Sequence, residues 1–135
     1  TGVDSLAIAC GTAHGDYPKG FIPTINFDVI KGVKQAVNMP LALHGGSGSG
    51  DQNIRKAVEA GINKVNIATE IFNACRDYAK NRLDYMSLMM EVEQECKKTV
   101  KHFISLTGSE GKAAGFKKKY AFCHGISQID TGIGE

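Results

Sequence analysis

The sequence lacks a long apolar run, a signal peptide and a paired-cysteine motif. None of its apolar runs approaches the roughly 18 residues that a membrane span requires. The opening stretch, TGVDSLAIACGTAHG, lacks the basic start of a signal peptide. The four cysteines lie far apart and form no Cys-x-x-Cys pair, the spacing of zinc and redox motifs. We therefore expect reduced, buried thiols, a cytoplasmic location and no membrane partner.

The sequence also lacks an excess of charge of either sign. It carries 16 Lys plus Arg against 14 Asp plus Glu, so its net charge gives no attraction to nucleic acid. Any anionic ligand must therefore be held by a local site. The 135 residues fit one domain with its own core. Because the chain has no initiator Met and runs almost directly into a strand pattern, we expect it to be cut from a larger gene product.

Short apolar runs bounded by Gly, Pro or Asn predict three strands that are buried on both faces. They span residues 5–10, 40–44 and 64–69. Helical periodicity predicts helices over residues 27–37 and 51–61, and two more that include residues 71–79 and 89–104. Such alternation predicts a parallel sheet, either doubly wound or a piece of a (β/α)₈ barrel.

Local signals predict where these elements begin and end. Asn26 is the expected N-cap of the first helix, and Asp51 that of the second. Gly61 suits the left-handed position that follows the second helix. Residues 116–135 have no clean period, and we expect a poorly ordered or docking tail there.

Polar motifs follow each predicted strand, at the edge where parallel sheets bind ligands. GTAHGDYPKG follows the first strand, HGGSGSG follows the second, and NIATE ends the third. His14 and His44 each stand just beyond a strand and are each followed by glycine. Two neutral imidazoles at neighbouring strand ends could share one zinc ion. The alternative is that each histidine only hydrogen-bonds loop backbone.

The glycine-rich loop and the third strand suggest where an anion would bind. In the loop of Gly45, Gly46, Ser47 and Gly48, successive backbone N–H groups can point into one concavity, which suits phosphate, although such loops also occur as plain turns. Asn66 in an apolar strand needs a partner, either a ligand or a neighbouring strand. We place Lys64 at the start of its strand, on the far side from the histidines, which argues against a Schiff-base lysine.

Three motifs together resemble a known enzyme family. VDSLAIACGTAHGDY, PLALHGGSG and NKVNIATE, followed by a late GSEGKA, are similar in order and spacing to the zinc-dependent class II aldolases of fructose or tagatose 1,6-bisphosphate. The resemblance covers residues 1–115 and leaves 116–135 outside it. That family is a (β/α)₈ barrel, and this stretch looks like its sixth, seventh and eighth strands with the closing helices. The resemblance therefore implies the α/β fold of a TIM barrel's C-terminal portion.

The resemblance also implies a set of site residues and a reaction. It makes His14 and His44 zinc ligands. The implied substrate and phosphate site consists of Gly15, Gly45, Gly46, Ser47, Asn66, Ile67, Ala68 and Thr69. Backbone oxygens of these loops would help to hold a monovalent cation, Na⁺ or K⁺. The implied lyase reaction is reversible aldol cleavage of the sugar bisphosphate to dihydroxyacetone phosphate and glyceraldehyde 3-phosphate, a step of glycolysis.

One half of the family's pattern has no counterpart in this sequence. The remaining zinc histidine and the Asp that serves as proton donor belong to the first half of the barrel, and Asp16 does not lie where the family places that acid. We therefore assign no catalytic residue and expect the chain alone to be inactive, completed by the missing half-barrel or by homo-oligomerisation. The alternatives are a non-catalytic phosphate-binding or assembly subunit, and another phosphate-binding barrel in which the histidines are incidental.

Overall fold

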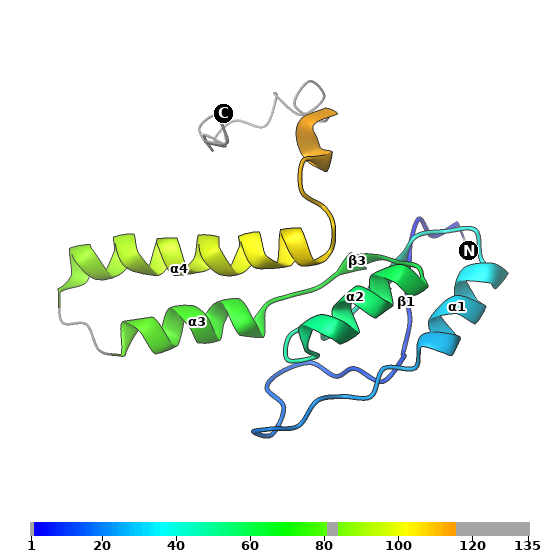
Figure 1. Ribbon diagram of the computed structural model, residues 1–135, viewed down its shortest axis with the longest axis horizontal. Helices are drawn as coiled ribbons and strands as arrows, with labels where there is room; N and C mark the ends of the chain where they lie inside the picture. Colours follow the sequence, from blue (N-terminus) through cyan, green and yellow to red (C-terminus); the bar gives the residue numbers. More distant parts are fainter. Residues whose placement is uncertain (1, 81–83, 116–135) are drawn as a thin grey trace.

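A computed structural model of the chain describes residues 2–80 and 84–115, which form one α/β unit (Figure 1). Its elements are β1 (Leu6–Ala7), α1 (Phe27–Ala36), β2 (Leu41–Leu43), α2 (Asp51–Ala60), β3 (Ile62–Val65), α3 (Thr69–Ala79), α4 (Tyr85–Leu106) and the 3₁₀ helix η1 (Lys112–Gly115). The predicted alternation of strands and helices is confirmed. The tail expected at residues 116–135 lies outside the described residues.

The three strands form one parallel sheet in the order β1-β2-β3. Leu41 pairs with Leu6 on one side and with Ile62 on the other, so β2 is the central strand. All of β2 is buried, as predicted for a parallel strand covered on both faces. The same prediction is wrong for β1 and β3, which are only partly buried because they lie at the edges of this sheet. The predicted parallel sheet is therefore present, and it brings the carboxyl ends of the three strands to one edge.

The third strand begins and ends earlier than the pattern predicts. Gly61 ends α2 with φ 123°, and the chain turns there directly into β3, which spans Ile62–Val65 instead of residues 64–69. Helix α3 begins at Thr69, so the NIAT motif forms the connection from strand to helix. The prediction that residues 66–69 belong to the strand is therefore wrong. The motif still lies at the carboxyl end of β3.

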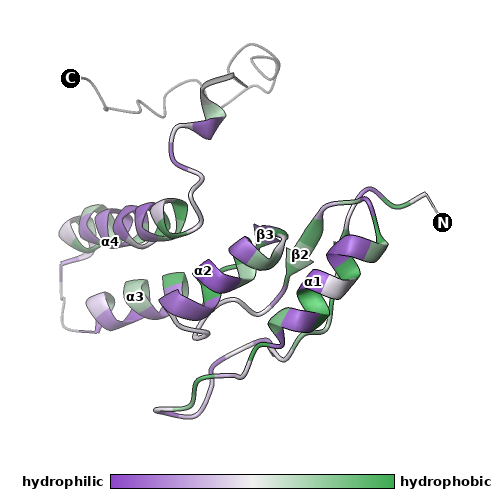
Figure 2. Ribbon diagram, turned by 45° about the vertical axis from the view of Figure 1, so that its right-hand side comes forward, coloured by the Kyte–Doolittle hydropathy of each residue, from purple (hydrophilic) through white to green (hydrophobic). Residues whose placement is uncertain are grey.

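The core lies between the sheet and the first two helices. Ile30 of α1 and Ile54 and Ala57 of α2 are buried against Leu41 and Leu43 of β2. The apolar stripes of the two helices therefore face the sheet. Figure 2 shows that both helices carry hydrophobic and hydrophilic residues.

The two predicted helix caps differ in outcome. The Asn26 side chain accepts a hydrogen bond from the Val29 N–H, so its predicted cap of α1 is confirmed. Asp51 is instead the first residue of α2, and Gly50, with φ 80°, occupies the cap position without a side-chain bond. A glycine there leaves the first N–H groups of α2 to other acceptors or to solvent.

Helices α3 and α4 lie side by side and extend away from the sheet (Figure 1). The Tyr78 hydroxyl donates to a Glu91 carboxylate oxygen at 2.6 Å across this pair. In the described part of the chain, no helix is both long and apolar enough to cross a membrane.

An apolar groove of about 340 Å³ runs between β3 and α4. Its walls include Ile62, Val65 and Ile67 on one side and Val100 and Phe103 on the other. Within the described residues, the outer edges of β1 and β3 pair with no further strand. The sheet therefore has two free edges, and one of them lies beside an apolar groove.

Candidate functional site

The two predicted metal-binding histidines lie next to each other, beyond the ends of β1 and β2. The ring centroids of His14 and His44 are 5.4 Å apart, and the ring planes meet at 69°. Two imidazoles on one tetrahedral zinc, with Zn–N bonds of about 2.0–2.1 Å, have centroids roughly 5 Å apart. Both side chains are exposed, so the pair has the spacing and the access to hold one cation together.

Contacts between the two loops hold the histidines in place. The Thr12 hydroxyl donates to the His44 carbonyl oxygen at 2.7 Å. Gly45 has φ 63°, and a Cβ added there would lie 2.2 Å from the Ala13 carbonyl oxygen. Only glycine allows this close approach, which brings the loop after β2 against the loop after β1.

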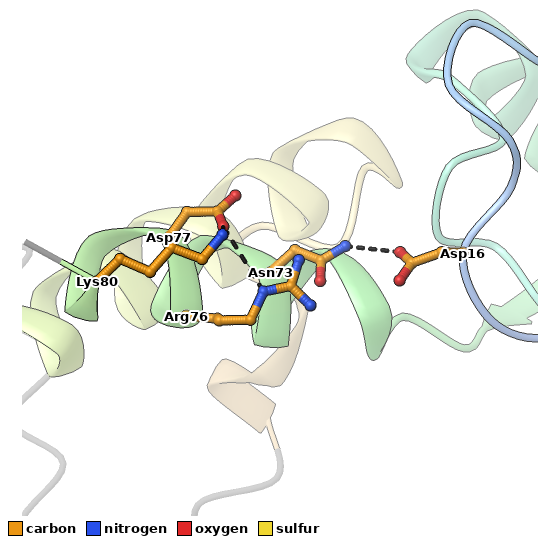
Figure 3. A network of polar contacts seen from close by, with 5 residues as sticks. All are labelled: Asp16, Asn73, Arg76, Asp77 and Lys80. Atoms are coloured by element: carbon orange, nitrogen blue, oxygen red, sulfur yellow. Dashed lines mark hydrogen bonds and ion pairs between the residues drawn. The ribbon is translucent and has the colours of Figure 1, made fainter.

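A catalytic zinc site uses three protein ligands, of which His14 and His44 could supply two. Residues 2–80 and 84–115 contain no cluster of three or more His, Cys, Asp or Glu side chains that could hold a metal. Asp16 is near His14 in sequence, but its carboxylate accepts a hydrogen bond from Asn73 Nδ2 at 2.7 Å (Figure 3). That bond ties the loop after β1 to α3.

Ser47 of the glycine-rich loop caps α3 from outside the helix. Its hydroxyl oxygen accepts from the Ala68 N–H at 3.1 Å and from the Glu70 N–H at 3.4 Å. Ala68 occupies the N-cap position and makes no side-chain cap bond of its own. Because Ser47 is only 5% exposed, its hydroxyl is a fixed part of the junction between the loop and α3.

The backbone N–H groups of the loop donate to different acceptors. Gly46 donates to the Asn66 carbonyl oxygen at 3.1 Å, and Ser49 donates to the Gly46 carbonyl oxygen at 3.2 Å. Gly48 donates to Glu70 Oε1 at 2.8 Å. The last contact is with an anion, since Glu70 places a carboxylate where the sequence predicts a phosphate.

Gly46 allows this loop to pack against the end of β3. A Cβ added to Gly46 would lie 2.7 Å from Val65 Cγ1 and 3.0 Å from the Asn66 carbonyl oxygen. A larger side chain would therefore push the loop away from β3.

A second pocket, of about 230 Å³, adjoins the loop that carries His14, although neither histidine lines it. It is lined by the loop from Gly15 to Phe21, by Ser47 and Gly48, and by Thr69, Glu70 and Asn73. Small-molecule sites usually enclose about 300–1,000 Å³, so this pocket has the size of part of a site. It brings together three of the predicted binding residues, Gly15, Ser47 and Thr69.

Tyr17 shapes one wall of this pocket, and the sequence motifs did not point to it. Its hydroxyl oxygen accepts from the Ala13 N–H at 2.7 Å and donates to the Ala13 carbonyl oxygen at 3.1 Å. Its ring lies 5.6 Å from that of Phe21. The signal was an aromatic residue in a loop rich in Gly and Pro. Glu70 and Asn73 were also missed, because their partners lie 22 and 57 residues away in sequence.

The connection after β3 divides between two surfaces. The Asn66 amide nitrogen lies 3.3 Å from His44 Nδ1, so Asn66 belongs to the histidine site. The Ile67 side chain lines the apolar groove instead of the pocket that begins at Gly15. Ala68 contributes its N–H to Ser47. Successive residues of the predicted binding motif thus face different surroundings.

The far-side location that we predicted for Lys64 is wrong. Because β3 starts at Ile62, Lys64 is its third residue, and its ammonium donates a hydrogen bond to Asn66 Oδ1. Asn66 in turn contacts His44, so a chain of polar contacts leads from Lys64 to the histidine pair. Location therefore gives no argument against a role for Lys64.

Comparisons with known proteins relate the chain to one family. A sequence profile described as "Fructose-bisphosphate aldolase class-II" matches residues 1–112. The uncharacterized protein YdjI of Escherichia coli K12 is 44% identical over 115 residues, which cover 84% of this chain and 41% of YdjI. The chain therefore spans about two fifths of the length of this relative.

Two solved structures resemble the fold. The crystal structure of the YdjI aldolase from Escherichia coli K12 matches with a TM-score of 0.73 and 40% identity, over 84% of this chain and 42% of that one. The structure of a proposed fructose-1,6-bisphosphate aldolase from Coccidioides immitis matches with a TM-score of 0.75 and 27% identity, over 84% and 41%. The match over residues 1–112 spans the histidine loops, the glycine-rich loop and the NIAT connection. The chain belongs to the class II fructose-bisphosphate aldolase family.

Proposed function

We propose that this chain carries part of the active site of a zinc-assisted lyase that cleaves a ketose 1,6-bisphosphate. Fructose 1,6-bisphosphate is the favoured substrate, since glycolysis needs it more widely than tagatose bisphosphate. The products are dihydroxyacetone phosphate and glyceraldehyde 3-phosphate. The observation that carries the proposal is the pairing of the His14 and His44 rings, whose centroids are 5.4 Å apart, next to the loop pocket that begins at Gly15.

Different residues of the chain would bind the metal, the sugar and the phosphate. His14 and His44 would supply two zinc ligands, and the bound zinc supplies polarisation of the substrate ketone. The Asn66 amide oxygen accepts from Lys64 and its nitrogen lies 3.3 Å from His44 Nδ1, which leaves one amide N–H to donate toward a substrate oxygen. Gly15, Ser47 and Thr69 line the pocket in which a phosphate would bind. Close contact between the loops at Ala13 and Gly45 supports a role for their backbone carbonyls in holding Na⁺ or K⁺.

The proposed architecture is the sixth to eighth strands of a (β/α)₈ barrel. Three parallel strands cannot close a barrel, and the free edges of β1 and β3 each present unpaired backbone groups. Further strands, from the same protein or from a partner subunit, would pair with these edges and cover the groove beside β3. They would also bring the remaining zinc ligand and the proton donor, so the chain alone is expected to be inactive.

A non-catalytic phosphate-binding or assembly subunit is the second candidate. Two observations favour it. The Glu70 carboxylate accepts the Gly48 N–H that a phosphate would need. The described residues also offer only two histidines, His14 and His44, as ligands for a shared metal ion. The two candidates differ in turnover. Sugar-phosphate binding without cleavage supports the subunit, whereas cleavage supports the enzyme.

Aldol cleavage by the full-length protein tests the first proposal. We expect cleavage of fructose 1,6-bisphosphate that EDTA abolishes and added zinc restores. His44→Ala should remove this activity, whereas His102→Ala is the matched control, because His102 is exposed on α4 and pairs with Asp51 at 3.1 Å. Activity that survives both EDTA and His44→Ala would contradict the proposal.

A further inference from the structure

Two cysteines face each other where α3 packs against α4. Both Cys75 and Cys96 are half-buried, and both are free thiols. Cys75 Sγ lies 3.9 Å from the Val92 carbonyl oxygen, one helical turn before Cys96 on α4. The thiol of α3 therefore already touches the backbone of α4 next to Cys96.

The register of the two helices places the thiols opposite each other. Ile71 and Val100 line the same groove. Ile71 lies one turn before Cys75 on α3, and Val100 lies one turn after Cys96 on α4. The two helices run antiparallel. One turn forward along α3 and one turn back along α4 therefore lead from the pair Ile71 and Val100 to the pair Cys75 and Cys96. Burial, and then contact with the Cys96 thiol, raise the pKa of Cys75, which agrees with this juxtaposition.

Helix packing geometry allows a covalent bond at such a position. Helix axes pack about 8–10 Å apart, and Cα atoms lie about 2.3 Å from each axis, so facing Cα atoms are roughly 3.5–5.5 Å apart. A disulfide requires Cα atoms about 4.4–6.8 Å apart, a range that overlaps this one.

We propose that Cys75 and Cys96 form a redox-sensitive thiol pair, which a peroxide converts into a disulfide that joins α3 to α4. In the first step, the Cys96 thiol loses its proton and its thiolate attacks the peroxide, because the raised pKa of Cys75 disfavours the thiolate there. The O–O bond breaks, a sulfenic acid forms, and the hydroxide that leaves takes up the released proton to give water. In the second step, the other thiol attacks the sulfenic sulfur, the S–S bond forms, and a second water leaves. Both sulfurs are oxidised, and hydrogen peroxide is the oxidant, which is reduced to water.

Peptide mapping of the full chain tests this pair. Trypsin cleaves after Lys64, Arg76, Arg82 and Lys97, so Cys75 and Cys96 fall in separate peptides, 65–76 and 83–97. After treatment with hydrogen peroxide and alkylation of the remaining thiols, we expect these two peptides to appear linked without reductant and separate after reduction. Recovery of both peptides alkylated and unlinked, or linkage to Cys10 or Cys123 instead, would overturn the proposal.

Two variants sharpen the test. Cys96→Ser should abolish the linked peptide and leave Cys75 unlinked, whereas Cys10→Ser should leave the linked peptide intact, since Cys10 is buried beside the sheet. A linked Cys75 peptide in Cys96→Ser would overturn the proposal. The mapping reads the wild-type chain directly, so the conclusion does not depend on either variant folding.

Discussion

At the scale of single residues, the polar contacts from Lys64 through Asn66 to His44 fix the orientation of the Asn66 amide. An ammonium group can only donate hydrogen bonds, so the Asn66 oxygen must face Lys64 and its nitrogen must face His44. The direction in which Asn66 donates is therefore set by a residue that does not need to touch the substrate.

Replacement of Lys64 tests this positioning role in the full-length enzyme. Lys64→Met should lower kcat/KM by about tenfold, because a hydrogen bond to a charged group contributes about 1.5–3 kcal/mol and Lys64 is solvent-exposed. Lys64→Arg should restore much of the loss, since arginine also donates. Zinc content, measured alongside, should stay constant. Equal activity of Lys64→Met and wild type would contradict the role.

In the proposed phosphate site, the Glu70 carboxylate would compete with phosphate for the glycine-rich loop. Its carboxylate accepts the Gly48 N–H at 2.8 Å. Glu70→Gln should tighten binding of inorganic phosphate by about fivefold, because two unit charges about 4 Å apart in water repel by about 1 kcal/mol. Calorimetric titration measures the change, and Glu59→Gln, on the exposed face of α2, is the control. Weaker binding in Glu70→Gln would mean that the carboxylate helps to shape the site.

At the scale of elements, local sequence signals predicted most helices, and the misses have physical causes. Asn26 caps α1 as expected, because that signal lies within one helical turn. The cap of α3 is the Ser47 hydroxyl, which comes from another loop, and no local pattern contains it. The start of β3 was missed because Gly61 turns the chain into the strand at once.

Helix α4 should lose stability in acid through its own cap. Asp84 accepts from the Ser87 N–H at 2.8 Å, and this hydrogen bonding lowers the pKa of Asp84. A lowered folded-state pKa stabilises the helix above the ordinary aspartate value of about 3.9 and loses that effect as the pH falls through the folded-state value.

Circular dichroism of the chain across this acid range measures the effect. Wild type should lose helical signal as the pH falls from 5 toward 3, and Asp84→Asn should show a smaller pH dependence. Glu110→Gln, exposed beyond the end of α4, should behave as wild type. Identical acid profiles for Asp84→Asn and wild type would exclude the cap as the cause.

At the scale of the whole molecule, the described residues leave two sheet edges without a partner strand and expose an apolar groove beside β3. We expect the chain alone to bind the dye ANS, because the groove exposes apolar side chains. Ile104→Ser, in the groove, should reduce the fluorescence, whereas Met90→Ser, exposed at 68% elsewhere on α4, should reduce it less. A compact monomer that binds no dye would contradict this expectation.

The sequence predicts which residues lie in the candidate site where those residues directly follow strands. Parallel pairing carries His14 and His44 to one edge, so their proximity follows from topology. The contacts of Asp16 and Glu70 depend on side chains that reach across loops, which no spacing rule contains. The contact of Lys64 with Asn66 is local, and it was missed because the start of β3 was misplaced.

The central claim is that His14 and His44 share one zinc ion in the full-length protein. The most direct measurement is the zinc bound per protein after dialysis, for wild type, His14→Ala and His44→Ala. If both histidines bind one zinc ion, we expect one equivalent of zinc in wild type and a loss of nearly all of it in each variant, because removing either imidazole leaves too few ligands. Full zinc retention by either variant would contradict the claim.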